Sequence, residues 1–164
     1  NAQIAIVMKK KNKSLSIFLL YFFLILFYSP FSLAKENFSF LTLKNNKVNL
    51  RQGPSFDYPI KLIYNKKYLP VIILEKYDTW RKIKDFENNS GWIHISQLSK
   101  KKSAINIKNY SVLYKKSTIY SEPIANVETG RLLLIKKCKS NWCKITSGNY
   151  EGWILKDFLW GKTN

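Results

Sequence analysis

Short runs of β-branched and aromatic residues, separated by polar turn residues, fill the chain from Lys35 onward. Such runs are typical of β-strands. No stretch in this region combines the 3.6-residue hydrophobic period with good helix formers, and alanine is scarce, which also disfavours helix. The pattern therefore predicts an all-β fold.

The first half of this region divides into short strands and polar turns. Its strongest strand is Leu69–Tyr77, which has consecutive Val, Ile and Leu residues at its centre. Gly53 and Pro54 favour a loop over 51–55, and Tyr58 extends it because a residue before proline avoids helical geometry. The predicted strands are 38–44, 48–50, 60–64, 69–77, 80–85 and 91–94, followed by a 3₁₀ turn around 96–98.

The second half repeats this organisation. Its strongest strand is Arg131–Lys137, and Tyr120–Pro123 takes the place of the glycine–proline loop. The predicted strands are 110–114, 131–137, 142–146 and 152–155, and a 3₁₀ turn follows at 156–159. An extended segment over 104–108 either completes the first unit or bridges to the second.

A motif that occurs twice defines the domain organisation. Trp80-Arg81-Lys82-Ile83 followed by Gly91-Trp92-Ile93 returns as Trp142-Cys143-Lys144-Ile145 followed by Gly152-Trp153-Ile154. Internal repeats of this kind mark repeated structural units. We therefore expect two small β-barrels in tandem, over residues 35–103 and 104–164, with the lysine-rich segment 100–103 as the boundary.

The front of the chain has the organisation of a secretion signal. Met8 is followed by Lys9, Lys10, Lys11 and Lys13, then by an apolar run from Leu15 to Tyr28 and by Ser32-Leu33-Ala34. This order of charged, apolar and small residues predicts a signal peptide within residues 1–34, with Met8 as initiator and cleavage after Ala34. The alternative is an uncleaved anchor, but a spanning helix needs about 20 apolar residues and Pro30 ends this run earlier. The expected location is therefore periplasmic or secreted, with the membrane reached only through an uncleaved signal.

The chain is strongly basic. It has 28 Lys and Arg residues against 10 Asp and Glu. Four of the lysines lie before residue 35 and no acidic residue does, so the remainder carries 24 − 10 = +14. This charge favours anionic partners. The chain is also rich in Asn, Ile, Tyr and Phe, residues that share A/T-rich codons with Lys, so codon bias explains the same composition without any binding role.

The two cysteines, Cys138 and Cys143, flank a four-residue loop. This spacing differs from the Cys-x-x-Cys of redox enzymes, and one histidine cannot complete a zinc site with them. Paired residues that flank such a hairpin loop have close Cβ atoms. In an exported protein these two residues are therefore expected to form a disulfide. Lys76 and Arg81 occupy the same places in the first unit.

These motifs together resemble the bacterial SH3-like (SH3b) family. The matching residues are the Val48–Ser55 run, the hairpin tryptophans Trp80 and Trp142, and the Gly-Trp-Ile strands. The match is closer to secreted tandem-SH3 proteins of alphaproteobacterial type, which share further motifs with this chain: Tyr58–Ile60, Leu69–Val71, Trp80–Ile83, Gly91–His94, Cys138–Cys143 and Trp160-Gly161. The resemblance implies two tandem SH3-like small β-barrels after an N-terminal signal peptide, export, and barrels that hold cell-wall peptides or protein segments. The second unit departs from it because it lacks Arg-x-Gly-Pro.

No combination of residues points to catalysis. His94 lies in a different unit from both cysteines and reads as a half-buried strand residue. Asp85 and Glu87 bracket a polar turn and are expected to face solvent. The chain has no phosphate-binding glycine loop and no nucleophile elbow. We expect a protein that is not an enzyme and that has no cofactor and no metal site.

Aromatic residues beside loops and turns are the candidate ligand-binding residues, because Trp and Tyr join a large apolar face to a polar tip. Trp80 and Trp142 adjoin turns and are expected to be exposed, whereas Trp92 and Trp153 belong either to the groove or to the core. The candidates in the first unit, with one arginine, are Arg51, Tyr58, Tyr64, Tyr77, Trp80 and Trp92, and those in the second are Tyr120, Trp142 and Trp153.

Arg51 has two interpretations. It could bind a ligand carboxylate with both guanidinium nitrogens, or it could brace its own loop against Asp57 or Glu87. The sequence as a whole predicts a non-catalytic binding module of the cell envelope, with peptidoglycan or an extended peptide as ligand. The alternative is a scaffold for another envelope protein. Nucleic acid is disfavoured because it is scarce outside the cytoplasm, although basic charge with interleaved aromatic residues would suit it.

Overall fold

The computed structural model describes residues 39–163. These residues belong to one compact unit. The predicted initiator Met8, the signal peptide and the cleavage after Ala34 lie outside the described residues. Within 39–163 there is no helix long and apolar enough to cross a membrane.

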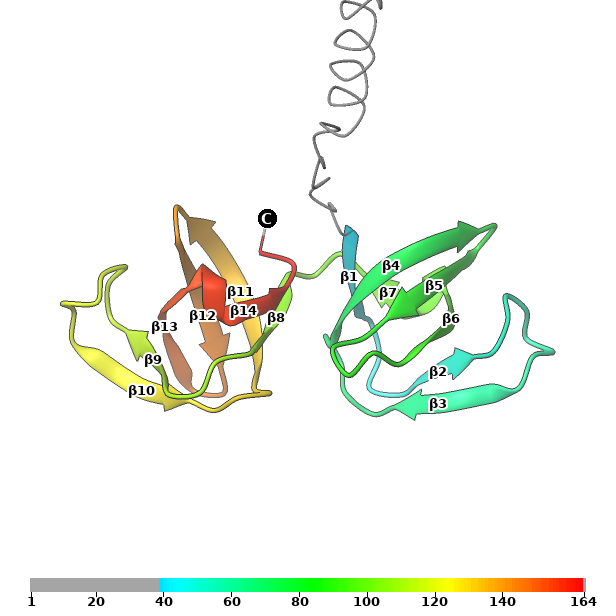
Figure 1. Cartoon of the computed structure of the whole chain (residues 1–164), viewed down its shortest axis with the longest axis horizontal. Coiled ribbons are helices and arrows are strands. Elements are labelled where there is room, and N and C mark those ends of the chain that lie inside the picture. Colours follow the sequence, from blue (N-terminus) through cyan, green and yellow to red (C-terminus); the bar gives the residue numbers. More distant parts are fainter. Residues whose placement is uncertain (1–38, 164) are drawn as a thin grey trace, which may run out of the picture. The chain divides into compact units, whose positions relative to one another are not determined.

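The first barrel is a seven-stranded antiparallel sheet that curls around its own core (Figure 1). Its strand order is β3-β2-β6-β5-β4-β1-β7, and a 3₁₀ turn, η1 (Ile95–Gln97), lies between β6 and β7. The strands are β1 (Ser39–Leu43), β2 (Val48–Arg51), β3 (Ile60–Tyr64), β4 (Pro70–Tyr77), β5 (Trp80–Lys84), β6 (Ser90–His94) and β7 (Leu98–Ser99).

The second barrel has the same strand order, β10-β9-β13-β12-β11-β8-β14, with η2 (Lys156–Phe158) in the place of η1. Its strands are β8 (Ser103–Asn106), β9 (Ser111–Tyr114), β10 (Pro123–Val127), β11 (Leu132–Lys139), β12 (Trp142–Ser147), β13 (Tyr150–Leu155) and β14 (Leu159–Gly161). The predicted all-β fold and both 3₁₀ turns are confirmed.

Two differences from the expected strands have physical causes. β10 was not predicted, because it begins with proline and contains few β-branched residues; proline is tolerated there since it is the first residue of an edge strand. The 103–106 segment belongs to the second sheet, where β8 pairs with β11 and β14. The two sheets thus divide within 100–102.

Register relates the barrels residue by residue. Arg51 pairs with Trp92 as Tyr114 pairs with Trp153. Both long hairpins also shift register at the same place, between Ile73 and Glu75 in one and between Ile135 and Lys137 in the other. Positions in the two barrels can therefore be compared directly.

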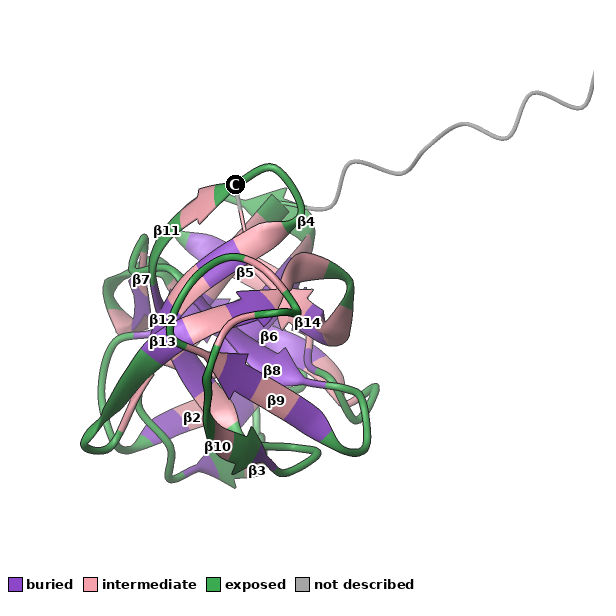
Figure 2. Ribbon diagram, turned by 90° about the vertical axis from the view of Figure 1, so that its left-hand side faces the viewer, coloured by how far each residue is buried: buried purple, intermediate pink, exposed green. Residues whose placement is uncertain are grey.

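Each barrel has its own apolar core on the inner face of its sheet, visible as purple segments in Figure 2. The central members of the first core include Leu50, Ile83 and Ile93, and those of the second include Leu113, Ile145 and Ile154; all are at most 1% exposed. Because side chains alternate across a strand, the isoleucines point inward while the tryptophans beside Ile93 and Ile154 point to the other face.

The glycine of each Gly-Trp-Ile motif lets two strands cross closely. A Cβ at Gly91 would lie 2.6 Å from the carbonyl oxygen of Arg51, and one at Gly152 would lie 2.7 Å from that of Tyr114. Glycine is therefore required where β6 passes β2 and where β13 passes β9. This explains why the motif occurs once per barrel.

A few contacts join the two barrels. The Ser103 hydroxyl donates to the carbonyl oxygen of Tyr68 at 2.6 Å. The ring of Trp160, in β14, packs edge-on against Phe40 and Phe86, with centroids 5.2 and 5.6 Å apart. Aromatic packing and one hydrogen bond thus connect residues of the two sheets.

Candidate functional site

The loop between β2 and β3 of the first barrel, residues 52–59, folds back over the outer face of the sheet. It is closed by a hydrogen bond from the backbone N–H of Gln52 to the carbonyl oxygen of Pro59, 3.1 Å long. Inside the loop, the Tyr58 ring packs against Gly53, where a Cβ would come within 2.6 Å of the ring. Gly53 is needed for this packing, which sets the position of the rest of the loop.

Three rings form the centre of the candidate site. Phe56, from the loop, lies 4.9 Å from Trp80 of β5 and 5.5 Å from His94 of β6, between ring centroids. Trp80 and His94 are cross-strand partners with centroids 5.3 Å apart. The rings line a cavity of about 220 Å³, completed by Lys47, Asn49, Arg51 and Gln97. Its walls are aromatic and its rim is basic and polar.

Phe56 and Trp80 differ strongly in exposure to solvent. Phe56 is 66% exposed, whereas Trp80 is only 6% exposed because Phe56 and His94 cover it. The expectation that Trp80 is exposed was therefore wrong. Phe56, which the sequence analysis did not select, presents the accessible apolar surface.

Arg51 braces the loop, but not through the partners expected from the sequence. Its Nη1 donates to the carbonyl oxygen of Tyr58 at 2.7 Å, and its guanidinium carbon lies 5.6 Å from the centre of the Phe56 ring. Asp57 instead accepts a hydrogen bond from Ser55. Arg51 thus holds Phe56 in place while lining the cavity.

His94 contributes a defined hydrogen-bonding edge. Its Nδ1 accepts a hydrogen bond from the backbone N–H of Ser96 and lies 2.8 Å from the Ser96 hydroxyl oxygen. In the neutral ring this assigns the hydrogen to Nε2, which is then a donor. The half-buried strand position expected for His94 is what the structure shows.

The other candidates of the first barrel lie away from this cavity. Trp92 is 9% exposed, lies outside the isoleucine-lined core and is covered by Tyr77 and Lys82. Tyr58 and Tyr77 are exposed. Of the six candidates here, the structure brings Arg51 and Trp80 together in one cavity.

Tyr64 belongs to the core of the first barrel. Its hydroxyl donates to a carboxylate oxygen of Asp85 at 2.9 Å, and Asp85 also accepts from the backbone N–H and the side chain of Asn89. Burial and then the hydrogen bond to Asp85 raise the pKa of the Tyr64 phenol. Asp85 is 4% exposed, so the expectation that it faces solvent was wrong. Its three hydrogen bonds explain how a carboxylate is tolerated there.

The second barrel lacks the aromatic cover. Its equivalent loop, 115–122, has the same length and the same closing hydrogen bond, from Lys115 to Glu122. Ile119 stands where Phe56 stands and is 57% exposed, while Tyr120 is also exposed. Trp142 packs against Tyr114, and Trp153 lies beneath Lys137. Both tryptophans are half-buried, and the structure does not gather Tyr120, Trp142 and Trp153 around one cavity.

The predicted disulfide is confirmed. Cys138 and Cys143 are direct partners across the β11–β12 hairpin and are joined by a disulfide. Lys76 and Arg81 are the matching pair in the first barrel. The disulfide is therefore a feature of the second barrel.

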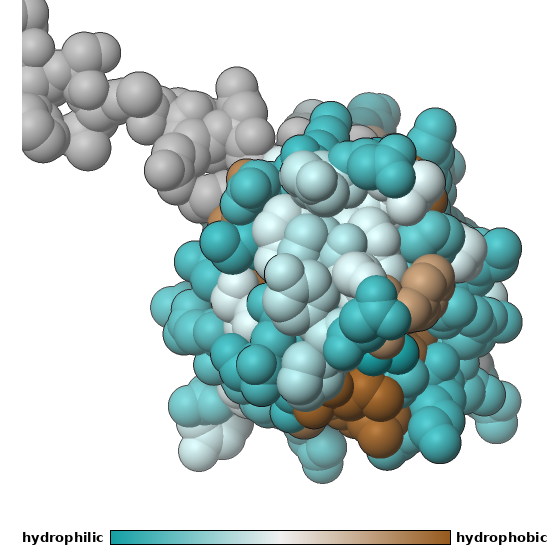
Figure 3. Space-filling model, turned by 90° about the vertical axis from the view of Figure 1, so that its right-hand side faces the viewer, coloured by the Kyte–Doolittle hydropathy of each residue, from teal (hydrophilic) through white to brown (hydrophobic). Residues whose placement is uncertain are grey.

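Figure 3 views the molecule from the side that carries the 52–59 loop. Most of this surface is hydrophilic or intermediate, with one hydrophobic patch. Sequence reasoning missed Phe56 and the site role of His94. The signal that could have found them is the cross-strand pairing of Trp80 with His94, together with a loop long enough to fold back over that pair.

The curled seven-stranded sheet, the long loop between its first two hairpin strands and the closing 3₁₀ turn define a small SH3-type β-barrel, and all three features are present twice. Residues 44–100 and 108–161 each match the bacterial SH3 domain family, and the chain belongs to that family. The predicted resemblance is thereby confirmed.

Among solved structures, the chain is similar to NlpC2 from Trichomonas vaginalis (17% identity, TM-score 0.35, covering 79% of this chain and 50% of that one). It is also similar to NlpC1 from the same organism (16% identity, TM-score 0.35, 80% and 48%). The chain thus spans about half the length of each. No curated protein matches it.

Proposed function

We propose that this protein is a non-catalytic binding module of the cell envelope, in which the first barrel holds a peptide segment of the cell wall. The observation that carries the proposal is the Phe56–Trp80–His94 cavity with its basic rim. Bacterial SH3 domains are often cell-wall binding modules, and SH3-type barrels take extended peptides in aromatic-lined grooves.

The chemistry of the cavity suits such a ligand. The exposed ring of Phe56 offers an apolar face to one ligand side chain, and a volume of about 220 Å³ accommodates a single side chain rather than a whole small molecule. Arg51, Lys47 and the Nε2 hydrogen of His94 supply donors for carbonyl and carboxylate oxygens. These groups match an extended peptide that carries free carboxylates.

A binding role, rather than catalysis, is supported by the state of the reactive side chains. Both cysteines are joined in the disulfide, and no described cysteine is free to act with His94. His94 is instead packed between two rings. An envelope location is supported by the signal-like sequence at the front of the chain and by the disulfide, which is typical of oxidising compartments.

Retention on purified sacculi tests this proposal. We expect a fragment of residues 37–164 to be retained and Phe56→Ala to reduce its retention by about tenfold or more, because an aromatic anchor is typically worth more than about 1 kcal/mol. Ile119→Ala is the matched control, since it truncates the equivalent exposed residue of the second barrel. It should bind as the unmodified fragment does.

Two outcomes would contradict the proposal. One is an absence of retention at moderate salt, and the other is equal retention of the two variants. Cross-linking in cells that recovers one defined envelope protein and no wall material would favour a scaffold instead. Retention that falls by about 10³-fold between 50 and 200 mM salt would indicate a purely electrostatic, nucleic-acid-like mode.

A further inference from the structure

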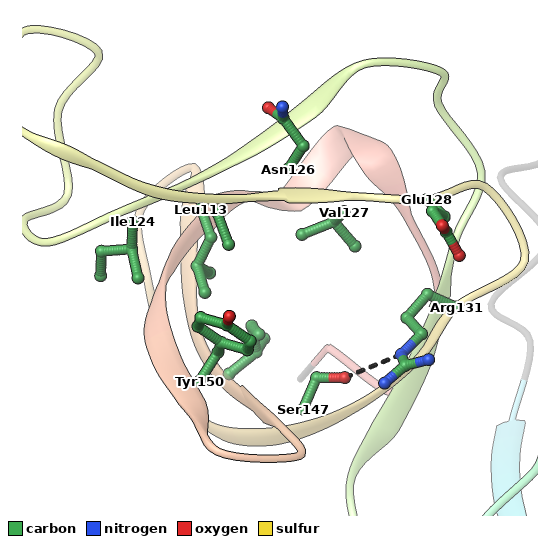
Figure 4. A pocket seen from close by; sticks show the side chains of 10 residues that line it. Leu113, Ile124, Asn126, Val127, Glu128, Arg131, Ser147 and Tyr150 are labelled. Atoms are coloured by element: carbon green, nitrogen blue, oxygen red, sulfur yellow. Dashed lines mark hydrogen bonds between the residues drawn. The ribbon is translucent and has the colours of Figure 1, made fainter.

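The second barrel contains a cavity of about 450 Å³ at the open end of its core (Figure 4). Leu113, Val127 and Ile145 belong to its lining, and all three are core residues. In Figure 4 the side chains of Leu113, Val127, Ser147 and Tyr150 surround an open centre, whereas Asn126 points away from it. This volume falls within the range of about 300–1,000 Å³ that is usual for small-molecule sites.

The same end of the first barrel also carries a hollow, of about 520 Å³, and its lining includes Leu62, Tyr64 and Leu69. The two barrels therefore differ in the side chains that line this end of the core. Val48 pairs with Tyr64 as Ser111 pairs with Val127, so Val127 occupies the place of Tyr64. By the same register Ala125 occupies the place of Leu62, which packs on the first core. A tyrosine and a leucine are thus replaced by a valine and an alanine, so the wall of the second cavity consists of smaller, wholly apolar side chains at these two positions.

The rim has gained a cation. Leu69, which packs on the first core, directly precedes β4, and Arg131 directly precedes β11. The preceding residues, Tyr68 and Gly130, both have positive φ (65° and 80°), which confirms the equivalence. The apolar Leu69 of the first barrel thus corresponds to the guanidinium of Arg131, which lies at the mouth of the cavity in the second barrel.

Among residues 39–163, the side chain of Arg131 makes one hydrogen bond, which leaves four of its five N–H donors available. Its Nε donates to the Ser147 hydroxyl oxygen at 3.1 Å, shown as the dashed line in Figure 4. None of the salt bridges among residues 39–163 involves Arg131 or the nearby Glu128. The two Nη groups can therefore donate to an incoming carboxylate, the geometry that arginine recognises best.

We propose that this cavity is a second ligand site, specific for a small aliphatic group that bears a single carboxylate. The apolar body packs against Leu113, Ala125 and Val127, and the carboxylate meets Arg131 beside Ser147. Glu128 also lines the rim and opposes a second negative charge on the ligand. The site is chemically distinct from the aromatic cavity of the first barrel and does not depend on the function proposed for it.

Three probes separate the parts of this recognition. N-acetyl-leucine has the apolar body and the carboxylate, N-acetyl-leucinamide keeps the body without the charge, and acetate keeps the charge without the body. In a titration of residues 37–164 followed by amide chemical shifts, we expect N-acetyl-leucine to move the amides of Val127, Arg131 and Ser147 with a Kd in the millimolar range. The other two probes should bind at least about tenfold more weakly than N-acetyl-leucine, since a charge-assisted contact is worth about 1.5–3 kcal/mol.

Substitutions that give the second barrel the residues found at matching positions of the first barrel test which side chains form the site. Arg131→Leu should abolish the preference for the acid over the amide, and Ala125→Leu should remove binding of both by filling the cavity. Asn126→Ile also installs a first-barrel residue, but on the side that points away, and should leave binding unchanged. Dispersed amide spectra of each variant establish that it is folded.

The proposal is overturned if N-acetyl-leucine causes no shifts, if acid and amide bind equally, or if acetate matches N-acetyl-leucine. Unchanged binding by folded Ala125→Leu would overturn it as well. Because Ala125→Leu and Arg131→Leu act on different parts of the site, a folding failure of one variant leaves the other decisive.

Discussion

The two barrels share strand order, register shifts and glycine crossings, yet different interactions complete them. The first closes its core with a buried Tyr64–Asp85 hydrogen bond. The second has Val127 in the place of Tyr64, and it has a disulfide and a cluster of ion pairs on the strands of its hairpin instead. The comparison shows that the inward isoleucines and the close crossings at Gly91 and Gly152 define the barrel, while the open end of the core is free to vary.

The largest effect is expected where the first barrel is made to resemble the second. Tyr64→Val should destabilise the first barrel by about 3 kcal/mol, because it opens a cavity and removes a hydrogen bond. Tyr64→Phe is the matched control and should cost about 1 kcal/mol, since Asp85 retains its bonds to Asn89. Urea unfolding, with amide hydrogen exchange followed in β5 and in β12, measures each barrel separately. Equal losses for the two variants would show that Tyr64 does not fill space.

An intermediate effect is expected from removing the disulfide. Replacing Cys138 and Cys143 together by serine should destabilise the second barrel by about 2 kcal/mol, the value for a loop this short. The first barrel should be unaffected. Lys76→Ala with Arg81→Ala changes the matching pair and serves as the control, with an expected effect within about 0.5 kcal/mol. Exchange in β12 that is unchanged by the cysteine replacement would contradict the prediction.

The smallest effect is expected from the ion pairs of Glu151. Its carboxylate pairs with Lys136 and with Lys144, and hydrogen bonds from these two lysines lower its pKa to about 2. In the first barrel Ser90 occupies the place of Glu151.

Because the folded-state pKa lies below the unfolded value of about 4.3, the contribution is fully present above pH 4.3 and is lost as the pH falls toward 2. Glu151→Gln should therefore lower stability slightly near neutral pH, and the difference should vanish in acid and in high salt. Glu75→Gln, which breaks one longer ion pair with Lys82, is the control and should show a smaller difference. A difference that persists at pH 2 would exclude an electrostatic origin.

The sequence predicted the features that depend on local pattern. The Trp and Gly-Trp-Ile motifs correctly indicated two copies of one β-barrel, and the spacing of Cys138 and Cys143 across a hairpin indicated the disulfide. Both features arise within a few residues of a turn, where periodicity and spacing determine which side chains meet.

The sequence did not predict features that depend on distant residues. The burial of Asp85 arises from a bond to Tyr64, 21 positions away. The burial of Trp80 depends on where the 52–59 loop places Phe56, and alternation along β5 cannot show whether a loop will cover its outer face. The different lining of the second barrel's cavity becomes apparent only when register aligns Ala125, Val127 and Arg131 with Leu62, Tyr64 and Leu69.

The short connection between the sheets has a consequence for binding strength. Residues 100–102 span at most about 10 Å when fully extended, so this connection keeps the two barrels, and with them the two pockets, close to each other. Under the two proposals above, a polymer that carries groups for both pockets would meet the second pocket at a high effective concentration once the first is engaged, provided that the spacing of those groups allows both to bind. Two individually weak sites would then give durable attachment to a repetitive surface, whereas single soluble fragments of it would be released quickly.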